Sequence, residues 1–273
     1  MTVLDTFRSQ SGQAFLLRAA TIADAAAMAQ VCMESFAASA IARGMHGPTG
    51  YSEAGRASMQ ATIEKDISEQ GGYSVPTYVV AELMASSDEI VATPTSESHE
   101  NQNIKGSSKI IGVSKWHFNL DATHVTKVPP TAVNTASRDE EHESLAQVFF
   151  SGCYNIRERY IQAEGLTHTV LSILAVSPAA QGFGAGYALL RWGTSYASRN
   201  GWACWLTSTP VGYRVYQKIG FKDIDVVDFN LSRWGLCKLD ESEDWGEKLG
   251  IAIAGVVENG WYRQILMKLP ASG

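Results

Sequence analysis

The clearest pattern in the chain is a change from a continuous apolar run to apolar residues at helical spacing. Residues 170–176 form the apolar run, which predicts a strand. The next apolar positions recur every three or four residues and predict a helix with one apolar face: Ala185, Leu189, Trp192 and Tyr196. A second strand at 202–208 and a short helix at 211–219 follow, and Gly220 is predicted to cap that helix in the left-handed conformation. The rest of the chain is organised around this strand–helix–strand–helix unit.

Further elements flank this unit on both sides. β-Branched and aromatic runs predict strands at 15–18, 78–83, 109–118, 222–229 and 261–269. Thr21 and Asp24 have the spacing of a capping box and predict a helix start, whereas 41–48 is expected to be a loop. One further helix is predicted from Ser52 to about Glu69. Another is predicted to start at the acidic run 139–143 and to end at Glu164. This order indicates a mixed α/β sheet covered by helices.

Three polar or irregular stretches interrupt the pattern, near 84–108, 121–136 and 232–260. The first is dominated by Ser, Thr, Glu, Asn and Asp, a composition that buries too little apolar surface to fix itself. With no internal repeat and no second glycine-rich motif, we interpret these stretches as insertions in a single domain covering 1–273.

A glycine-rich turn at 181–186 connects the central strand to its helix. The strand stops at Ser177-Pro178, and a turn of this kind brings backbone N–H groups to the positive end of a helix, where anions bind. A P-loop is excluded because Tyr187-Ala188 stand where Lys and Ser or Thr are needed. A dinucleotide fingerprint is excluded because Tyr187 replaces its last glycine and 202–208 contains no acidic residue.

The pattern that remains has three parts in order: Val176-x-Pro178, Gln181-x-x-Gly-x-Gly186, and Tyr216-x-x-x-Gly-Phe221. This set resembles the central motif of the GNAT superfamily of acetyl-CoA-dependent N-acetyltransferases. Leu17–Thr21 with Asp24 is similar to the family's N-terminal element, and the long insertions resemble those of fungal members. One departure is that Thr207–Pro210 lacks the Asn that many members carry after the second strand.

The resemblance implies a mostly antiparallel sheet in which one parallel strand pair splays apart to admit the coenzyme. Pantetheine would pair with the first of these strands, the Leu174 N–H would polarise the thioester carbonyl, and Tyr216 would be the general acid for the departing thiolate. The catalytic residue implied is therefore Tyr216. The cofactor-binding residues implied are Leu174, Ala175, Val176, Gln181, Gly182, Phe183, Gly184, Ala185, Gly186 and Tyr216.

Several roles stay open from the sequence. His168 and Ser172 share a strand face, and water held by either could collect the amine proton. Cys204 could form an acetyl-enzyme, although a small buried hydrophobic role is favoured between two Trp residues. Residues that could line one wall of the acceptor site are Arg43, His46, Tyr51 and Glu53.

Composition narrows the partners. A net charge of -6 and a pI near 5.5 argue against nucleic-acid and anionic-membrane partners, which clustered Lys and Arg would hold. The 4 Cys lie far apart with no metal-ligand spacing, which favours a reduced intracellular protein without a metal. No leader and no apolar run of about 20 residues is evident, so a soluble, cytoplasmic protein is expected.

Two function classes follow. The first is an N-acetyltransferase that moves an acetyl group from acetyl-CoA to an amine, with a small molecule favoured over a protein N-terminus because no peptide-docking segment is evident. The second is a module that binds acyl-CoA without efficient transfer. The sequence leaves the acceptor and the oligomeric state open.

Overall fold

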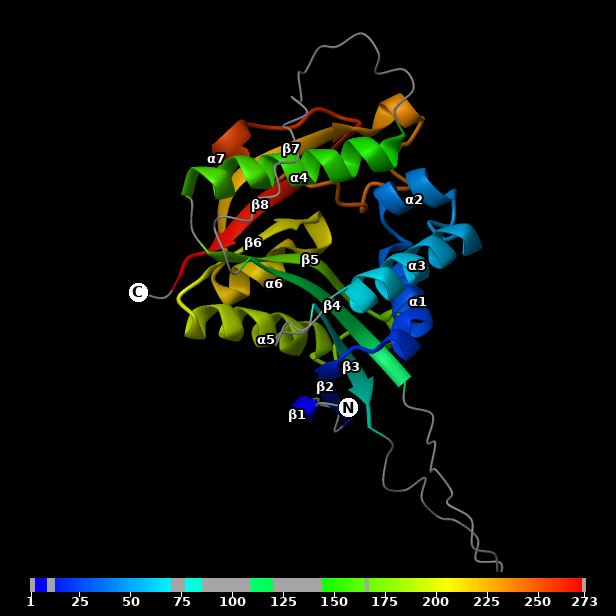
Figure 1. Ribbon diagram of the computed structural model, residues 1–273. Coiled ribbons are helices and arrows are strands. Elements are labelled where there is room, and N and C mark those ends of the chain that lie inside the picture. Colours follow the sequence, from blue (N-terminus) through cyan, green and yellow to red (C-terminus); the bar gives the residue numbers. More distant parts are fainter. Residues whose placement is uncertain are drawn as a thin grey trace, which may run out of the picture. The chain divides into compact units, whose positions relative to one another are not determined.

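The structure, a computed structural model, describes residues 3–8, 13–69, 77–84, 109–119, 144–164 and 167–271. The expected insertion at 121–136, and all but Met84 of the one at 84–108, lie outside the described residues. The chain forms one sheet with strand order β1-β2-β3-β4-β5-β6-β8-β7 (Figure 1). The strands are β1 (Val3–Arg8), β2 (Ala14–Ala19), β3 (Tyr78–Leu83), β4 (Lys109–Asn119), β5 (His168–Val176), β6 (Ala203–Ser208), β7 (Lys222–Asn230) and β8 (Trp261–Leu269).

The helices lie between these strands along the chain, with three of them in succession after β2. They are α1 (Ala25–Phe36), α2 (Ala40–His46), α3 (Glu53–Glu69), α4 (Leu145–Glu164), α5 (Ala185–Arg199), α6 (Pro210–Ile219) and the short α7 (Ile251–Ala254). Antiparallel pairing joins β1 to β2, β2 to β3, β3 to β4, and β8 to both β6 and β7, whereas β5 and β6 are parallel. The predicted class, a mixed and mostly antiparallel sheet with one parallel pair and flanking helices, is confirmed.

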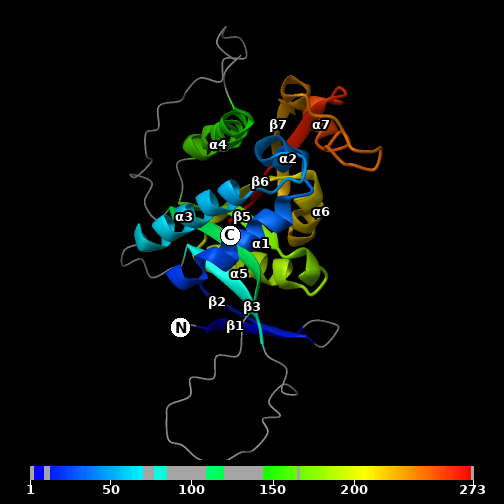
Figure 2. The same ribbon diagram turned by 90° about the vertical axis from the view of Figure 1, so that its right-hand side faces the viewer.

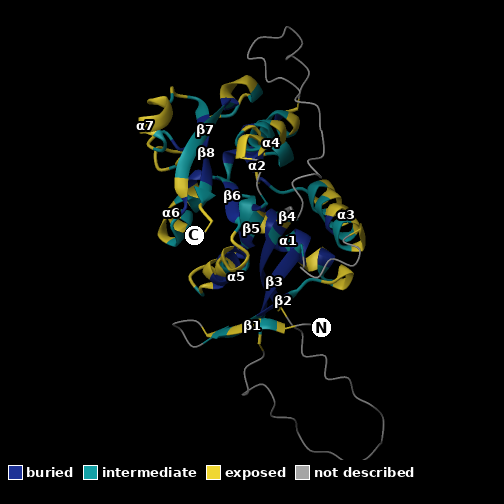
Figure 3. Ribbon diagram, turned by 60° about the vertical axis from the view of Figure 1, so that its left-hand side comes forward, coloured by how far each residue is buried: buried dark blue, intermediate teal, exposed yellow. Residues whose placement is uncertain are grey.

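Contacts within the chain define two compact units. Unit 1 comprises Met1–Ser35, Arg56–Lys115 and Leu174–Leu190, and unit 2 comprises Phe36–Gly55, Trp116–Ile173 and Arg191–Gly273. In unit 1, the hairpin of β1 and β2 begins the sheet (Figure 2). β3 is buried along nearly its whole length, while exposed residues gather on helices such as α3 and α5 (Figure 3).

A buried arginine in unit 1 explains the predicted capping box. Arg18 is 4% exposed and donates two hydrogen bonds of 2.7 and 2.8 Å to Asp24, besides one to Glu82. Asp24 also accepts the N–H of Thr21 at 2.7 Å. Burial opposes ionisation of Asp24, but the hydrogen bonds from Arg18 and Thr21 outweigh it and lower its pKa. The acid that starts α1 thus also neutralises a buried cation.

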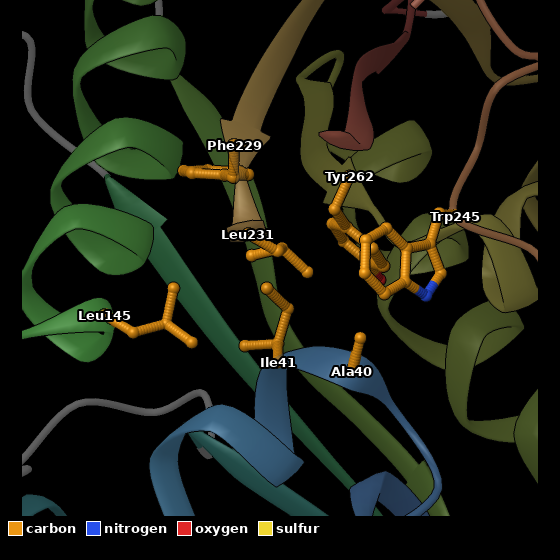
Figure 4. Packing of buried hydrophobic residues seen from close by; sticks show 7 residues of the cluster. All are labelled: Ala40, Ile41, Leu145, Phe229, Leu231, Trp245 and Tyr262. Carbon is orange, nitrogen blue, oxygen red and sulfur yellow. The ribbon is translucent and has the colours of Figure 1, made fainter. Parts of the chain in front are cut away.

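The expectation of a loop at 41–48 is wrong, because residues 40–46 form α2. The Ser39 hydroxyl accepts the Ala42 N–H at 3.1 Å and caps the helix. Ala40 and Ile41 pack in a buried cluster of unit 2 with Leu145, Phe229, Leu231, Trp245 and Tyr262 (Figure 4). Glycine is favoured at position 44 inside this helix because a Cβ there would overlap the side chains of Leu145 and Leu236.

A second buried arginine holds the 232–260 segment in unit 2. Arg263 on β8 is 1% exposed and donates to Asp228 of β7 through two bonds of 2.7 Å. It also donates to the carbonyls of Leu249 and Gly255, on either side of α7, at 3.0 and 2.7 Å. This insertion is therefore ordered around one side chain.

Within the described ranges, no single helix is long and apolar enough to cross a bilayer. The segments Ile22–Phe36 and Ala40–His46, which are bent against each other, reach the required length and apolar composition only when they are taken together.

Candidate functional site

The two halves of β5 differ in pairing and exposure. Among the described residues, β5 pairs with β6 from His168 opposite Ala203 to Val170 opposite Trp205, and the pairing ends there. β6 continues to Ser208 in pairing with β8. On β5, residues 168–171 are buried, whereas Ser172 is exposed and Ile173, Leu174 and Val176 are half-buried. The parallel ladder therefore covers only the first part of β5, and most side chains beyond it are more exposed.

Backbone direction in the second half of β5 follows from its last contacts in unit 1. The Ser177 N–H donates to the Ile111 carbonyl of β4 at 2.9 Å. Because N–H groups of successive strand residues point to opposite edges, those of Val176 and Leu174 point to the edge away from β4. This is the edge on which pairing with β6 has stopped. Leu174 and Val176 thus present backbone groups along this edge, whereas the carbonyl of Ala175 faces β4.

The turn after β5 is built to leave amides free. Gly182 and Gly184 have φ of 85° and 87°, in the left-handed region that glycine adopts without strain. The N–H groups of Gly184, Ala185 and Gly186 have no hydrogen-bond partner among the described residues, because α5 begins at Ala185 and its first amides lack preceding carbonyls. Gln181 is exposed and Phe183 half-buried beside them. Consecutive free amides at a helix start form a concave anion site.

No charged side chain takes part in this turn. Residues 177–190 contain no Lys, Arg, Asp or Glu. A Cβ at Gly182 or Gly184 would meet nothing within 4 Å, so the backbone at both positions is open to a ligand. At Gly186 a Cβ would lie 3.3 Å from Val176, which brings the helix start close to the strand end. All cofactor-binding residues implied by the motif except Tyr216 therefore form one continuous feature of unit 1.

Tyr216 lies in unit 2 on α6, and its hydroxyl has no partner in the part of the chain that the structure describes. Its half-buried ring packs edge-on against Phe221 with centroids 5.9 Å apart. Tyr213, one turn earlier, instead donates to Asp223 at 2.6 Å and accepts from Gln217 at 2.7 Å. Burial raises the pKa of Tyr216, so the phenol keeps its proton at neutral pH.

Comparisons with known proteins rest on structure, because no family model and no curated sequence matches the chain. A putative arylalkylamine N-acetyltransferase 7 from the yellow fever mosquito is 12% identical, with TM-score 0.55 over 99% of this chain and 95% of that one. The polyamine N-acetyltransferase of Drosophila melanogaster is 12% identical, with TM-score 0.53 over 94% and 99%. A mosquito arylalkylamine N-acetyltransferase-like 5b is 14% identical, with TM-score 0.51 over the same shares. The chain has the fold of the GNAT acetyltransferases.

Within the GNAT fold, the two candidates for collecting the amine proton differ in access. His168 begins β5 and is 9% exposed, facing the paired and buried half of the strand. Ser172 is exposed in the open half. A hydroxyl that contacts solvent can hold a water molecule against a bound amine, whereas a buried imidazole cannot without movement. Access to solvent therefore favours Ser172 over His168 as the residue that could hold this water molecule.

Cys204 has the environment of a structural thiol. It is 1% exposed, and the Thr169 hydroxyl donates to its sulfur at 3.0 Å. Burial raises the pKa of Cys204 to about 11, so the thiolate needed for covalent catalysis is scarce at neutral pH. These observations argue against an acetyl-enzyme at this position.

The proposed acceptor wall is held by internal contacts of unit 2. Arg43 is 7% exposed, donates to Glu243 at 2.7 Å and to the Ala38 carbonyl at 2.9 Å, and thus anchors α2 to the 232–260 segment. Burial alone would raise the pKa of Glu243, but the hydrogen bonds from the Leu239 N–H and the Arg43 side chain lower it. The Tyr51 hydroxyl donates to Glu53 at 2.9 Å. Arg43 therefore has a structural role, and His46, Tyr51 and Glu53 are more accessible.

In the segment that lacks the usual Asn, the hydroxyls of Ser208 and Thr209 form local hydrogen bonds. Thr209 caps α6 by accepting the Gly212 N–H at 3.3 Å, and the buried Ser208 donates to the Thr209 carbonyl at 2.8 Å.

Within the described residues, no three His, Cys, Asp or Glu side chains gather as a metal site would require. One contact that the sequence does not reveal involves Ser35 of α1, which accepts the Val176 N–H.

Proposed function

We propose that the chain is an N-acetyltransferase that uses acetyl-CoA and acetylates a small-molecule amine by direct attack in a ternary complex. The observation that carries this proposal is the open half of β5 leading into a turn with free amides. An extended amide-bearing arm that ends in a pyrophosphate matches this order of an open strand edge and an anion site. Pantetheine joined to the coenzyme's pyrophosphate has that chemistry.

In this mechanism, the amine nitrogen attacks the thioester carbonyl carbon, and the carbon–sulfur bond breaks after the tetrahedral intermediate forms. The Leu174 N–H stabilises the oxyanion, and Tyr216 gives its proton to the departing thiolate. The amine loses a proton to water held at Ser172. The Tyr216 hydroxyl, which has no partner among the described residues, is protonated at neutral pH and can supply this proton.

Arylalkylamines and polyamines are the acceptors that we propose first, because the solved structures with the same fold are named for those substrates. A protein N-terminus is the competing acceptor. The competing function is a coenzyme-binding module with little transfer, which the capping role of Thr209 in place of a free Asn supports.

Calorimetry followed by a thiol-release assay tests the proposal. We expect saturable binding of acetyl-CoA and none of NAD or NADP, and then release of coenzyme A that depends on an arylalkylamine or a polyamine. Binding of a nicotinamide dinucleotide without a response to acetyl-CoA would overturn the coenzyme assignment. Coenzyme binding without thiol release, across small amines and peptides with free N-termini, would favour the binding module.

A further inference from the structure

The last turn of α1 contacts the open edge of β5 through one hydroxyl. Ser35 Oγ accepts a hydrogen bond from the Val176 N–H, with 3.4 Å between oxygen and nitrogen. Both residues belong to unit 1 and both are half-buried. The Ser35 side chain therefore accepts from a backbone N–H that would bond to a neighbouring strand in an ordinary sheet.

The geometry of β5 explains why this donor needs a partner. The Ser177 N–H is bonded to Ile111 of β4, and the Ala175 carbonyl lies 3.5 Å from a Cβ built at Gly112 of the same strand. Residues 175 and 177 thus face β4, and Val176 faces the opposite edge, beyond the last pair between β5 and β6 at Val170. A partly buried N–H without a partner is costly, and the Ser35 hydroxyl satisfies this one.

The bond between Ser35 and Val176 is a weak one. At 3.4 Å it lies beyond the usual 2.7–3.2 Å of an N–H···O bond, so it stabilises the free protein only slightly. An amide carbonyl that approached along the open edge could take the same N–H at a normal distance. The pantetheine arm of coenzyme A carries two such carbonyls, and the free amides of the turn lie immediately downstream on the chain.

We infer that Ser35 is a placeholder for the coenzyme: it holds the Val176 N–H while the site is empty and gives it up to an amide carbonyl of pantetheine. This inference rests on the proposed function. Ser35 is then a positioning residue that competes with the coenzyme for one donor. Its removal strengthens coenzyme binding, because water that reaches the half-buried Val176 is displaced more readily than a tethered hydroxyl.

Amide hydrogen exchange at Val176, measured by NMR on the full chain, tests the contact. We expect Ser35→Ala to speed exchange at Val176 in the free protein by severalfold and to leave the Ser177 amide, which is bonded to β4, unchanged. Glu34→Ala on the exposed face of α1 is the matched control, and Ser35→Thr, which keeps the hydroxyl, should preserve protection. Equal exchange at Val176 in the wild type and in Ser35→Ala would overturn the inference.

Calorimetry with coenzyme A tests the competition. We expect Ser35→Ala to lower Kd by about 2- to 3-fold, the low end of the range for one net hydrogen bond because the bond to Val176 is long, and Ser35→Thr and Glu34→Ala to leave Kd near the wild-type value. An unchanged or raised Kd in Ser35→Ala, with normal binding by the wild type, would refute the placeholder alone. Absence of coenzyme binding by the wild type would instead refute the proposed function.

Discussion

The second half of β5 is the more apolar in sequence, yet it is the less buried of the two. In the first half, Val170 is buried with Ile156, Ile161 and Trp205, and the strand pairs in register with β6. In the second half, Leu174 and Val176 are half-buried and the pairing has ended. The difference arises outside β5, because β6 keeps its pairing with β8 up to Ser208. Apolar residues in one strand can therefore serve a core at one end and a binding edge at the other.

The largest effect is expected on α6, where one tyrosine is engaged and another is free. Tyr216→Phe removes a proton donor that acts only when the carbon–sulfur bond breaks, so kcat should fall by about 10²–10⁴-fold while KM for acetyl-CoA changes little. Steady-state kinetics with an accepted amine measures both values.

Tyr213→Phe is the matched control for this substitution. It removes the hydroxyl bonded to Asp223 and Gln217, so it should lower the melting temperature and leave kcat near normal. An unchanged kcat in Tyr216→Phe would remove this residue from the mechanism.

The next effect concerns the turn that continues the open half. Gly184→Val forces a β-branched residue to φ of 87° and reorients the free amides around it, so coenzyme affinity should fall by about 100-fold or more. Gly201→Val is matched in conformation, since Gly201 has φ of 68° and also has open space around its Cβ position. Calorimetry should show a loss of coenzyme affinity for Gly184→Val and none for Gly201→Val. Normal affinity in a folded Gly184→Val protein would mean that the anion binds elsewhere.

The contrast within β5 can be tested directly by a pair of substitutions. Val170→Ala opens a cavity in the buried half and should lower the free energy of unfolding by about 2 kcal/mol with kcat preserved. Ser172→Ala in the open half should leave stability within about 0.5 kcal/mol and lower kcat by about 10-fold. Denaturant unfolding of both variants gives the free energies of unfolding, and steady-state kinetics gives their kcat values. If Ser172→Ala lost stability and kept its kcat, the open half would be part of the core.

The smallest effect is expected from salt. Because residues 177–190 carry no charged side chain, backbone amides alone would hold the pyrophosphate in this turn. Raising NaCl from about 50 to about 500 mM should then weaken coenzyme binding by no more than about 3-fold, since close contacts to fixed dipoles are screened less than exposed ion pairs. A steep salt dependence would point to Lys or Arg outside the turn.

Local patterns in the sequence predicted most of the central unit. The strand at 170–176 and the helix at 211–219 differ from β5 and α6 by at most two residues at an end, and the capping role of Gly220 is confirmed by its φ of 107°. The α2 helix was missed because its formation depends on packing of Ala40 and Ile41 against residues distant in sequence, such as Leu145 and Trp245.

Features of the candidate site that depend on distant neighbours were not predictable. Tyr213 and Tyr216 look alike in sequence, and only the position of Asp223 separates the bonded hydroxyl from the free one. The contact between Ser35 and Val176 joins residues 141 positions apart, and no local spacing signals it. Arg43 was a candidate for the acceptor wall, and its pairing with Glu243, which lies 200 positions further along, has no local signal in the sequence.

The position of β8 has a consequence for biosynthesis. Among the strands that the structure describes, β8 is the last in sequence, yet it lies between β6 and β7 and pairs with both. During translation, β6 and β7 are therefore complete before the strand that joins them exists, and both expose unsatisfied edges in the meantime. Arg263, which orders the 232–260 segment, arrives with the same strand. A nascent chain that stalls before Trp261 would present two strands with unpaired edges and a 232–260 segment without its contacts to Arg263. We expect chaperones to act on this species.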